Sequence, residues 1–316
     1  MNNEALILHN RELATPSGDL GAFVERVLDG IQSPSTRRNY RRDIRAFVAF
    51  MASKPEPLSK GLLNEFKARM KADGRGDHAI NSSLSAVRYF LREAAEDGQL
   101  DPVEVERACK VRNIQTRGTK AGNWLTKAQA ETLLQTPDSS TALAIRDRAI
   151  LACLLGAGLR RSECASLTVE HLQQREGRWV IVDIVGKRNK SRSIPIPSWC
   201  KALVDLWTSA AGITSGLVFR QASWGENKFV VGQEGLSDKG IARAVDRWAR
   251  EAGIAGLAAH DMRRTFAKLA HAGGADLAQI QLNLGHESLE TTQAYLGSKL
   301  NYQDAAADHL GLSVKL

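Results

Sequence analysis

The stretch LGHESLETTQAYL, residues 284–296, contains a histidine directly after a glycine and a tyrosine nine residues further on. On one continuous helix, at about 100° per residue, an offset of nine residues places two side chains on opposite faces. A task shared by both side chains therefore requires a break between them. Gly285 predicts the end of one helix and Ser288 predicts the start of the next. We expect His286 to lie in the connection and Tyr295 two turns into a short helix, where both can face one point.

Length and composition predict a globular protein with room for two domains. The chain has 316 residues, of which 43% are hydrophobic and 25% charged, enough to bury a sizeable core. It contains no run of about 18 apolar residues, and its first residues lack the basic start and apolar core of a secretory signal. These patterns predict neither a membrane span nor secretion, and we expect a cytoplasmic protein.

The cysteines are too widely spaced for a metal or disulfide framework. They form no CxxC pair and stand at Cys109, Cys153, Cys164 and Cys200. This spacing argues against a structural zinc site and against paired disulfides. We expect buried, reduced thiols, and we expect neither a metal site nor a cofactor.

The net charge of +8 favours a polyanionic partner, although many basic proteins bind nothing acidic. Residues 1–122 hold 20 Lys and Arg against 16 Asp and Glu, and the remainder holds 23 against 19. If the partner is nucleic acid, both parts of the chain should contact it. We then expect the protein to associate with the nucleoid.

An arginine-rich helix is predicted at STRRNYRRDIRAFVAFM, residues 35–51. At helical spacing, one arc of about 140° carries Arg37, Arg38, Arg41, Arg42 and Arg45. The adjacent arc is apolar and carries Tyr40, Ile44, Phe47 and Met51. Asp43 is the only acid within this run. We favour contact with a DNA backbone for the arginine face over simple solvation, because phosphate neutralisation dominates the affinity of such proteins for DNA.

The first part of the chain is expected to be a helical module that ends in a linker. After a tail at 1–19, the module spans 20–105, with further helices at about 59–72 and 79–97. Residues 106–122 lose apolar periodicity and read as the linker. The basic residues of this linker are Lys110, Arg112, Arg117 and Lys120. They would either contact a phosphate backbone or be merely solvated.

The second part opens with Thr126 as a helix cap, and residues 142–156 read as a buried helix. Residues 178–197, RWVIVDIVGKRNKSRSIPIP, form two β-branched runs around a basic turn, which is a hairpin signal. Helical segments are expected from there to the C-terminus. The tail at 301–316 contains a short possible helix.

Four places combine phosphate-binding or reactive groups with local structure that can hold them. In GAGLRRSECASL, residues 156–167, Arg160 precedes a helix and Glu163 can orient its guanidinium. In AHDMRRTFAKLAH, residues 259–271, a histidine and an arginine three residues apart share a helix face. The hairpin turn supplies Lys187, Arg188 and Lys190. The opening stretch is the fourth place.

In this order, the four motifs resemble those of the tyrosine recombinases, also called phage integrases. The resemblance rests on GLRRSE, GKRNK, HDMRRTFA and LGHESLETTQAYL and covers residues 123–300 as a catalytic domain. Less specifically, residues 20–105 are similar to the family's N-terminal, SAM-like core-binding domain. The implied fold is mainly α with a small β-hairpin or sheet, in the α+β class.

The resemblance also implies an active site. The activating residues would be Arg160, Lys187, His260, Arg263 and His286, with Tyr295 as the nucleophile. Arg160 is preferred over Arg161 because it follows GL and precedes xSE at the family's spacing. A guanidinium presents a planar fork to phosphate oxygens and stays charged, so two of them can stabilise the transition state of phosphoryl transfer.

The remaining groups would move protons. Tyrosine ionises near pH ~10, so its proton must leave during the attack, and His260 is the expected acceptor. Lys187 is the expected acid for the departing 5′ oxygen, while His286 would hydrogen-bond a non-bridging oxygen. A covalent 3′-phosphotyrosyl link would conserve the bond energy without ATP.

The implied partner is double-stranded DNA with specific recombination sites, bound by a dimer at one site and by a tetramer in synapsis. The tail at 301–316 would dock on a neighbouring protomer or on its own domain. An accessory DNA-bending protein or a partner recombinase remains open, as does the biological role in integration, excision or resolution. We expect a simple Xer-like, two-domain recombinase. The alternatives are a type IB-like topoisomerase and a DNA-binding regulator that has lost the activity.

Overall fold

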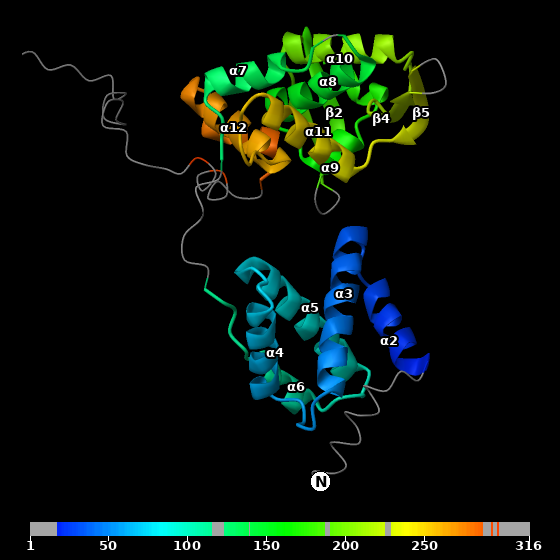
Figure 1. Cartoon of the computed structure of the whole chain (residues 1–316), viewed down its shortest axis with the longest axis vertical. Helices are drawn as coiled ribbons and strands as arrows, with labels where there is room; N and C mark the ends of the chain where they lie inside the picture. The colour runs from blue at the N-terminus through cyan, green and yellow to red at the C-terminus, as the bar shows by residue number, and fades with distance from the viewer. Residues whose placement is uncertain are drawn as a thin grey trace, which may run out of the picture. The chain divides into compact units, whose positions relative to one another are not determined.

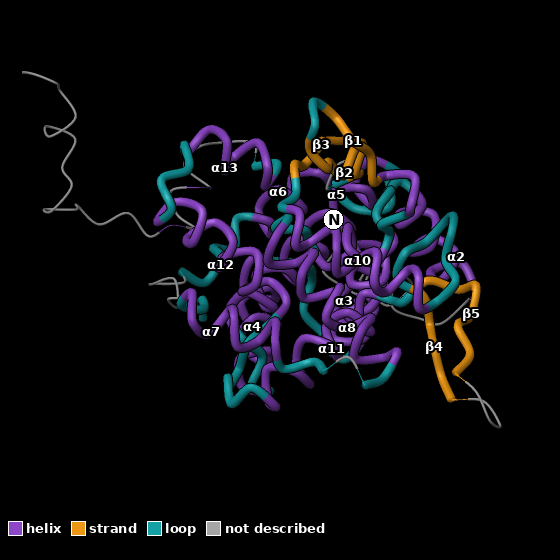
Figure 2. The backbone as a smooth tube through the Cα atoms, turned by 90° about the horizontal axis from the view of Figure 1, so that it is seen from above, coloured by secondary structure: helices purple, strands orange, loops and turns teal. Residues whose placement is uncertain are grey.

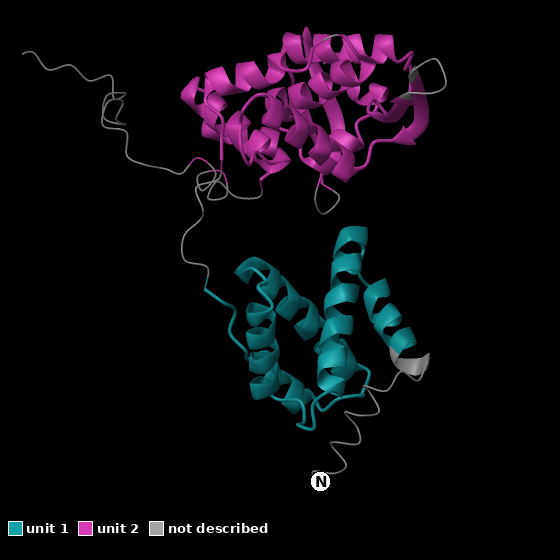
Figure 3. Ribbon diagram, in the orientation of Figure 1, with its two compact units in different colours: residues 1–120 teal, residues 121–316 magenta. Residues whose placement is uncertain are grey.

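The computed structural model describes residues 18–115, 123–138, 140–186, 190–224 and 229–286, together with Thr292 and Leu296. The chain divides into two compact units, Met1–Lys120 and Ala121–Leu316 (Figure 3). Three predicted segments fall wholly or mostly outside the described residues. They are the N-terminal tail, of which only residues 18 and 19 are described, residues 116–122 of the predicted linker, and the C-terminal tail at 301–316. The chain is mainly helical with small antiparallel sheets, as expected.

The N-terminal unit is a set of helices around one core (Figure 1). The described helices are α2 Gly18–Asp29, α3 Pro34–Ala52, α4 Lys60–Ala72, α5 Asp77–Glu96 and α6 Pro102–Cys109. The predicted helices near 35–51, 59–72 and 79–97 are confirmed by α3, α4 and α5. Their termini follow local chemistry, because the side chain of Ser33 caps α3 and that of Ser59 caps α4.

The predicted apolar face of α3 forms the centre of this unit. Ile44 and Phe47 are fully buried and Met51 is nearly so. The Phe47 ring packs edge-on against Phe66 of α4, with 5.2 Å between ring centroids. The arginine face of the same helix is thereby fixed in orientation, since rotation of α3 would expose these apolar side chains.

The prediction that a linker begins at residue 106 is wrong, because helix α6 crosses that position. Asp101 caps α6 by accepting a hydrogen bond from the backbone N–H of Val103 at 2.7 Å. Val105, Ala108 and Cys109 are buried against the N-terminal core. Their spacing is helical, but one short helix offers too few apolar positions to be recognised as periodic.

The chain beyond α6 remains attached to α5. Arg88 donates to the carbonyl oxygens of Cys109 and Val111 at 3.3 and 2.5 Å. The side chain of Asn81 makes two hydrogen bonds with the backbone of Ile114. Its Nδ2 donates to Ile114 O at 2.9 Å, and its Oδ1 accepts from Ile114 N at 2.8 Å. These contacts hold the backbone in place up to Ile114.

The C-terminal unit combines helices with two small sheets. Its helices are α7 Lys127–Gln135, α8 Ala142–Gly156, α9 Arg161–Ala165, η1 Val169–His171, α10 Ser198–Ala210, α11 Asp238–Glu251, α12 Ala259–Ala272 and α13 Leu277–Leu284. Its strands are β1 Leu172–Arg175, β2 Arg178–Val185, β3 Ser191–Pro195, β4 Arg220–Trp224 and β5 Phe229–Gly235.

Helix α8 is the centre of the C-terminal core and confirms the buried helix predicted at 142–156. It begins after Thr141, whose side chain accepts from the backbone N–H of Ala144. Helices α7, α10, α11 and α12 contact it from different directions. Its one buried acid, Asp147, is satisfied by the side chain of Arg146 and by the indole N–H of Trp248 at 3.0 Å. A buried charge requires such partners.

The two sheets lie at separate places in the C-terminal unit (Figure 2). The predicted hairpin at 178–197 is confirmed by β2 and β3, and β1 adds a third antiparallel strand beside β2. The second hairpin, β4–β5, was not predicted, because only helices were expected after residue 197. Its sequence is rich in glycine and polar residues, without the alternation that identifies a half-buried strand.

The predictions for the four cysteines are confirmed as far as burial is concerned. All four are buried free thiols. Burial raises the pKa of the Cys164 thiol well above its usual value, so this sulfur stays protonated and unreactive. In the described part of the chain, no helix is both long and apolar enough to cross a bilayer.

The corrected end of the N-terminal unit leads to a stability prediction. A fragment of residues 1–105 lacks the buried Ala108, Cys109 and Val111, whereas a fragment of residues 1–115 retains them. We expect the shorter fragment to be less stable by about 2–5 kcal/mol, the usual cost of losing buried apolar groups. Urea denaturation measures the difference. A fragment of residues 1–120 is the control and should match 1–115, and equal stability of 1–105 and 1–115 would contradict the account of α6.

Candidate active site

A buried carboxylate organises the positive charges of the C-terminal unit. Glu163 of α9 is 1% exposed. Its two oxygens accept hydrogen bonds from Arg192 at 2.8 Å each, and Oε1 also accepts from Arg160 Nη1 at 2.6 Å. Arg263 Nη1 lies 4.0 Å from the same carboxylate. Three guanidiniums from α12, β3 and the start of α9 therefore surround one acid.

The surrounding charge decides the protonation state of Glu163. Burial alone would raise the pKa of this carboxyl, and burial is the largest single cause acting on it. The hydrogen bonds and charges of Arg192 and Arg160 together outweigh burial and lower the pKa to about 2. Glu163 is thus ionised at neutral pH and keeps the cluster at a net charge of about +2.

The same three guanidiniums bind three successive carbonyl groups at the end of α13. Arg192 Nε donates to Asn283 O at 2.7 Å, Arg263 Nη2 donates to Leu284 O, and Arg160 Nη2 donates to Gly285 O at 3.3 Å. The last carbonyls of a helix have no partner within the helix and carry partial negative charge. The end of α13 is therefore fixed to the arginine cluster.

Two glycines make this close approach possible. Gly285 has φ +60° and ψ +49°, the left-handed conformation predicted for a helix end, and a Cβ there would lie 2.9 Å from Arg192 Cδ. Gly158 has φ +61°, and a Cβ there would meet the Phe266 ring at 2.7 Å. The Gly158 carbonyl oxygen accepts from Arg263 Nη1 at 2.6 Å. Any side chain at either position would push an arginine or its support away.

The two adjacent arginines of GLRRSE have different surroundings. Arg160 lies in the cluster around Glu163. Arg161 lines the same pocket as Arg160, but it does not contact Glu163: its Nε lies 3.6 Å from Asp238 Oδ2 of α11, and its side chain is 47% exposed. This geometry favours Arg160 over Arg161 as the phosphate-binding residue.

His260 and Arg263 lie on one face of α12, as their spacing predicted. With Arg160 they line a pocket of about 530 Å³, His260 at its rim and Arg263 at its buried end. Desolvation lowers the pKa of His260 below its usual value, and the guanidiniums of Arg264 and Arg263 lower it further. A neutral imidazole at pH 7 can accept a proton.

His286 directly follows the end of α13 and is half-buried. Its Nδ1 lies 3.0 Å from the hydroxyl oxygen of Thr292, which is fully buried. Burial, followed by the charges of Arg263 and Arg160, lowers the pKa of His286 to about 4. When the Thr292 hydroxyl donates to Nδ1, the proton of the neutral ring is on Nε2, which is then a hydrogen-bond donor.

Several predicted site residues lie outside the described residues, namely Lys187, Arg188, Arg117, Lys120 and Tyr295. Their assignments remain predictions, as does the cap at Ser288. Described residues close to Lys187 and Tyr295 in the sequence make hydrogen bonds that hold them in place. Gly186 N donates to Lys190 O at 2.8 Å at the base of the hairpin turn. Lys268 Nζ donates to Leu296 O at 2.8 Å, one residue after Tyr295.

Arg192 was missed from the sequence. It stands two residues before the buried Ile194 in strand β3, so strand alternation places both on the inward face. An arginine at an inward position of a short strand requires a buried acid or several carbonyl groups as partners. That inward position is the signal that could have identified it.

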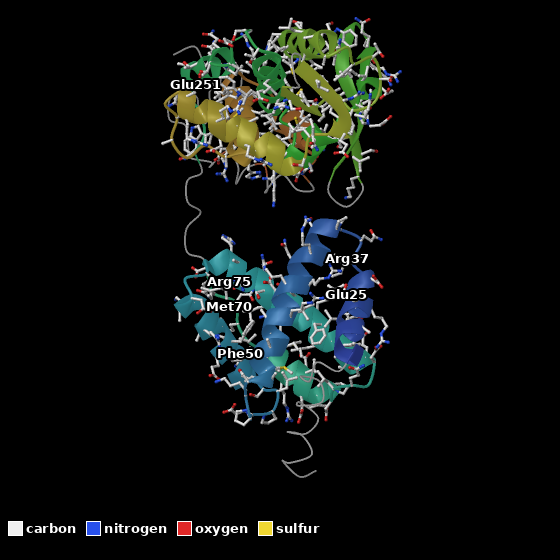
Figure 4. The ribbon with its side chains drawn as sticks, turned by 45° about the vertical axis from the view of Figure 1, so that its right-hand side comes forward. Glu25, Arg37, Phe50, Met70, Arg75 and Glu251 are labelled. Atoms are coloured by element: carbon white, nitrogen blue, oxygen red, sulfur yellow. The ribbon has the colours of Figure 1, made fainter. Side chains whose placement is uncertain are left out.

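The predicted arginine face of the N-terminal unit is more extensively paired than the sequence suggested. Arg41 Nε donates to Glu25 of α2 at 2.8 Å, Arg45 reaches the same carboxylate at 3.2 Å, and Arg37 lies 3.5 Å from Asp29. Figure 4 labels Glu25 and Arg37 on the neighbouring helices α2 and α3. Asp43 is therefore not the only acid near these arginines, because α2 brings two more that are distant in sequence.

The remaining basic residues that were predicted to contact DNA are partly paired and partly exposed. Arg42 pairs with the buried Asp43 at 3.0 Å, and Arg75 binds the same carboxylate. Arg38 is exposed, and its side chain makes no hydrogen bond or ion pair with another described residue. Lys110, Arg112 and Lys190 are exposed as well. These exposed cations have the accessibility that contact with a phosphate backbone requires.

Guanidiniums fixed beside a pocket are suited to bind a phosphodiester. The chain belongs to the phage integrase family, the tyrosine recombinases. The Phage integrase family matches residues 123–301, and the family's N-terminal SAM-like domain matches residues 22–98. The resemblance inferred from the four motifs is confirmed.

Individual relatives agree with this family. Tyrosine recombinase XerC of Pelobacter propionicus is 31% identical over 273 residues, which are 83% of this chain and 84% of the relative. The crystal structure of the XerH site-specific recombinase bound to palindromic difH substrate in a post-cleavage complex is 21% identical, with a TM-score of 0.66, covering 83% of this chain and 76% of that one. A lambda integrase dimer bound to a COC′ core site is 16% identical, with a TM-score of 0.64 and coverage of 94% and 98%. The two structures share the fold of this chain.

The surroundings of His286 predict an unusual titration. Its ring should take up a proton near pH 4 in the DNA-free protein, whereas an unperturbed histidine does so near pH ~6.5. Because the pKa is lower in the folded state, the free energy of unfolding should fall as the pH drops from about 6.5 toward 4. The measurement is the pH dependence of the ring proton resonances in protein labelled at histidine, with His286→Gln to assign the signal. A midpoint between about pH 6 and 7, the ordinary range, would contradict the account.

Proposed function

We propose that this protein is a site-specific DNA recombinase that cleaves and rejoins strands through a covalent 3′-phosphotyrosyl link to Tyr295. The observation that carries the proposal is the pairing of Arg160 and Arg263 around one buried carboxylate, beside a pocket that both line with His260. Membership of the tyrosine recombinase family supports it.

Arg160 and Arg263 would bind the non-bridging oxygens of the scissile phosphate. The bond from Arg160 to Gly285 O is long, at 3.3 Å, so a charged phosphate oxygen would be a stronger acceptor for the same N–H group. Arg263 is fixed by the carbonyl oxygens of Gly158 and Leu284. Guanidiniums held in place before the reaction stabilise developing charge without a reorganisation cost.

The proton transfers follow from the lowered pKa values of the histidines. As the Tyr295 oxygen attacks phosphorus, its proton would pass to neutral His260, and the bond from phosphorus to the 5′ oxygen would break. Lys187 would protonate that oxygen, and His286 would donate to a non-bridging oxygen. Attack by the 5′ hydroxyl of another strand then reverses each step, which restores Tyr295 and needs no ATP.

The proposed partner is double-stranded DNA carrying specific recombination sites. Exposed cations such as Arg38, Lys110 and Arg112 would contact its backbone. A dimer on one site and a tetramer in synapsis would follow the pattern of the family, with the protein in the cytoplasm at the nucleoid. The XerH and lambda integrase structures are DNA complexes of those two proteins, which supports this partner class.

Two alternative functions are less well supported. A type IB-like topoisomerase would use the same chemistry but would relax DNA without pairing two sites. A DNA-binding regulator without activity would have no need for the complete set of residue types that the chain retains at its four motifs. The relatives are tyrosine recombinases, which favours a recombinase over both alternatives.

A nicked suicide duplex tests the nucleophile. A Tyr295→Phe variant is first used to select a binding site from a randomised duplex library, and the selected site is then made with a nick beside the cleavage position. The wild type should form a covalent adduct that survives denaturing electrophoresis, and Tyr295→Phe should form none, because it lacks the attacking oxygen. An adduct in the phenylalanine variant would disprove the assignment. Exchange of flanking strands between two sites separates a recombinase from a topoisomerase.

Conservative substitutions test the two guanidiniums. Arg160→Lys and Arg263→Lys keep the charge but lose the fork, and each should slow adduct formation by about 10²–10³-fold, the usual effect of removing a preorganised donor. Arg161→Lys is the matched control, since this adjacent arginine also lines the pocket but points to Asp238 and lies outside the cluster around Glu163. Its rate should stay within about threefold of the wild type. Equal effects at residues 160 and 161 would contradict the proposed geometry.

A further inference from the structure

Arg192 is a buried cation in the site that the proposed chemistry does not use. Its side chain is 11% exposed. Both terminal nitrogens bind Glu163, and Nε binds Asn283 O. It is absent from the residues that line the pocket with Arg160, His260 and Arg263. Its role therefore has to be sought in what it does to its neighbours.

The first effect is electrostatic. Arg192 contacts both oxygens of Glu163, whereas the Arg160 side chain contacts one. Without Arg192, the carboxylate would be compensated mainly by Arg160, because Arg263 Nη1 is 4.0 Å away. A buried carboxylate held by one guanidinium competes directly with a phosphate for that guanidinium. Arg192 thus reduces the hold of Glu163 on Arg160.

The second effect is geometric. Through one guanidinium, strand β3 is bonded to α9 at Glu163 and to the end of α13 at Asn283. Gly186, at the base of the hairpin turn, is close enough that a Cβ there would lie 3.2 Å from Arg192 Nη1 and 3.2 Å from Arg160 Nη1. His286 follows Asn283 by three residues. A single side chain therefore links strand β3, Glu163 beside Arg160, and the end of α13.

We propose that Arg192 is a positioning residue for strand cleavage: it occupies the Glu163 carboxylate so that Arg160 can bind the scissile phosphate, and it fixes the end of α13 relative to Arg160. This role rests on the proposed function. Lysine cannot replace it, because one ammonium cannot reach both carboxylate oxygens and Asn283 O in the directions that the guanidinium fork provides.

The test is a set of variants made in the full-length protein: Arg192→Met, Arg192→Lys, Glu163→Gln and the double variant Arg192→Met with Glu163→Gln. Adduct formation is measured at saturating concentrations of the nicked suicide duplex, and DNA affinity is measured separately in the Tyr295→Phe background. Arg220→Met is the matched control, because Arg220 is a half-buried arginine in the same unit that binds the backbone carbonyl of Leu217 at 2.8 Å, away from Glu163.

We expect Arg192→Met to slow adduct formation by about 10–100-fold, the usual effect of losing a supporting contact, with duplex affinity changed less than about threefold. The double variant should recover at least about tenfold over Arg192→Met, because the neutral amide that Glu163→Gln introduces no longer competes for Arg160. Arg192→Lys should be slowed by at least about tenfold. Arg220→Met should keep the wild-type rate.

Several outcomes would overturn the inference. One is an Arg192→Met rate within about threefold of the wild type, and another is a double variant no faster than Arg192→Met, as expected if the arginine merely stabilises the fold. If Arg192→Met does not fold, the Arg192→Lys rate decides, and a rate equal to that of the wild type rejects the role. Absence of an adduct with the wild type would reject the proposed function instead, and with it the inference.

Discussion

The site depends on one ionised carboxylate in a place where water is excluded. Glu163 is buried, and an isolated charge at such a position would be costly. Three guanidiniums compensate it, and each of them comes from a different segment. The need to compensate this charge therefore fixes α9, β3 and α12 relative to one another. Removing one partner would leave charge uncompensated, so the cluster behaves as a unit and not as separate ion pairs.

The cluster is also organised before any phosphate arrives. In the described structure, the carbonyl oxygens of Leu284 and Gly285 accept hydrogen bonds from Arg263 and Arg160, the two arginines that would bind the phosphate. The surplus positive charge helps to keep His260 and His286 neutral, since the adjacent guanidiniums add to burial in lowering both pKa values. A bound phosphate would oppose that effect and raise the affinity of both rings for protons. Phosphate binding and proton transfer would thereby be coupled through charge.

Local patterns predicted a large part of this arrangement. The end of α13 at Gly285, the shared helix face of His260 and Arg263, and the hairpin around residue 187 follow from spacing and helix-end chemistry. The features that the sequence did not predict depend on contacts between residues that are far apart in the chain. Arg192 became informative only when β3 was placed beside Glu163, and the acids that pair with the α3 arginines come from α2, at residues 25 and 29. Helix α6 was too short to show periodicity, although its burial defines the end of the N-terminal unit.

The attachment of residues 109–114 to α5 limits the length of chain between the two units. Arg88 and Asn81 hold that segment, so only seven residues, 116–122, separate the described parts of the two units along the chain. Seven residues can span at most roughly 25 Å, even when they are fully extended. Once one unit is on a duplex, the other meets the same duplex at an effective concentration on the order of millimolar. If both units bind one duplex, as proposed, each could bind weakly by itself while the two together would remain on the DNA long enough for strand exchange.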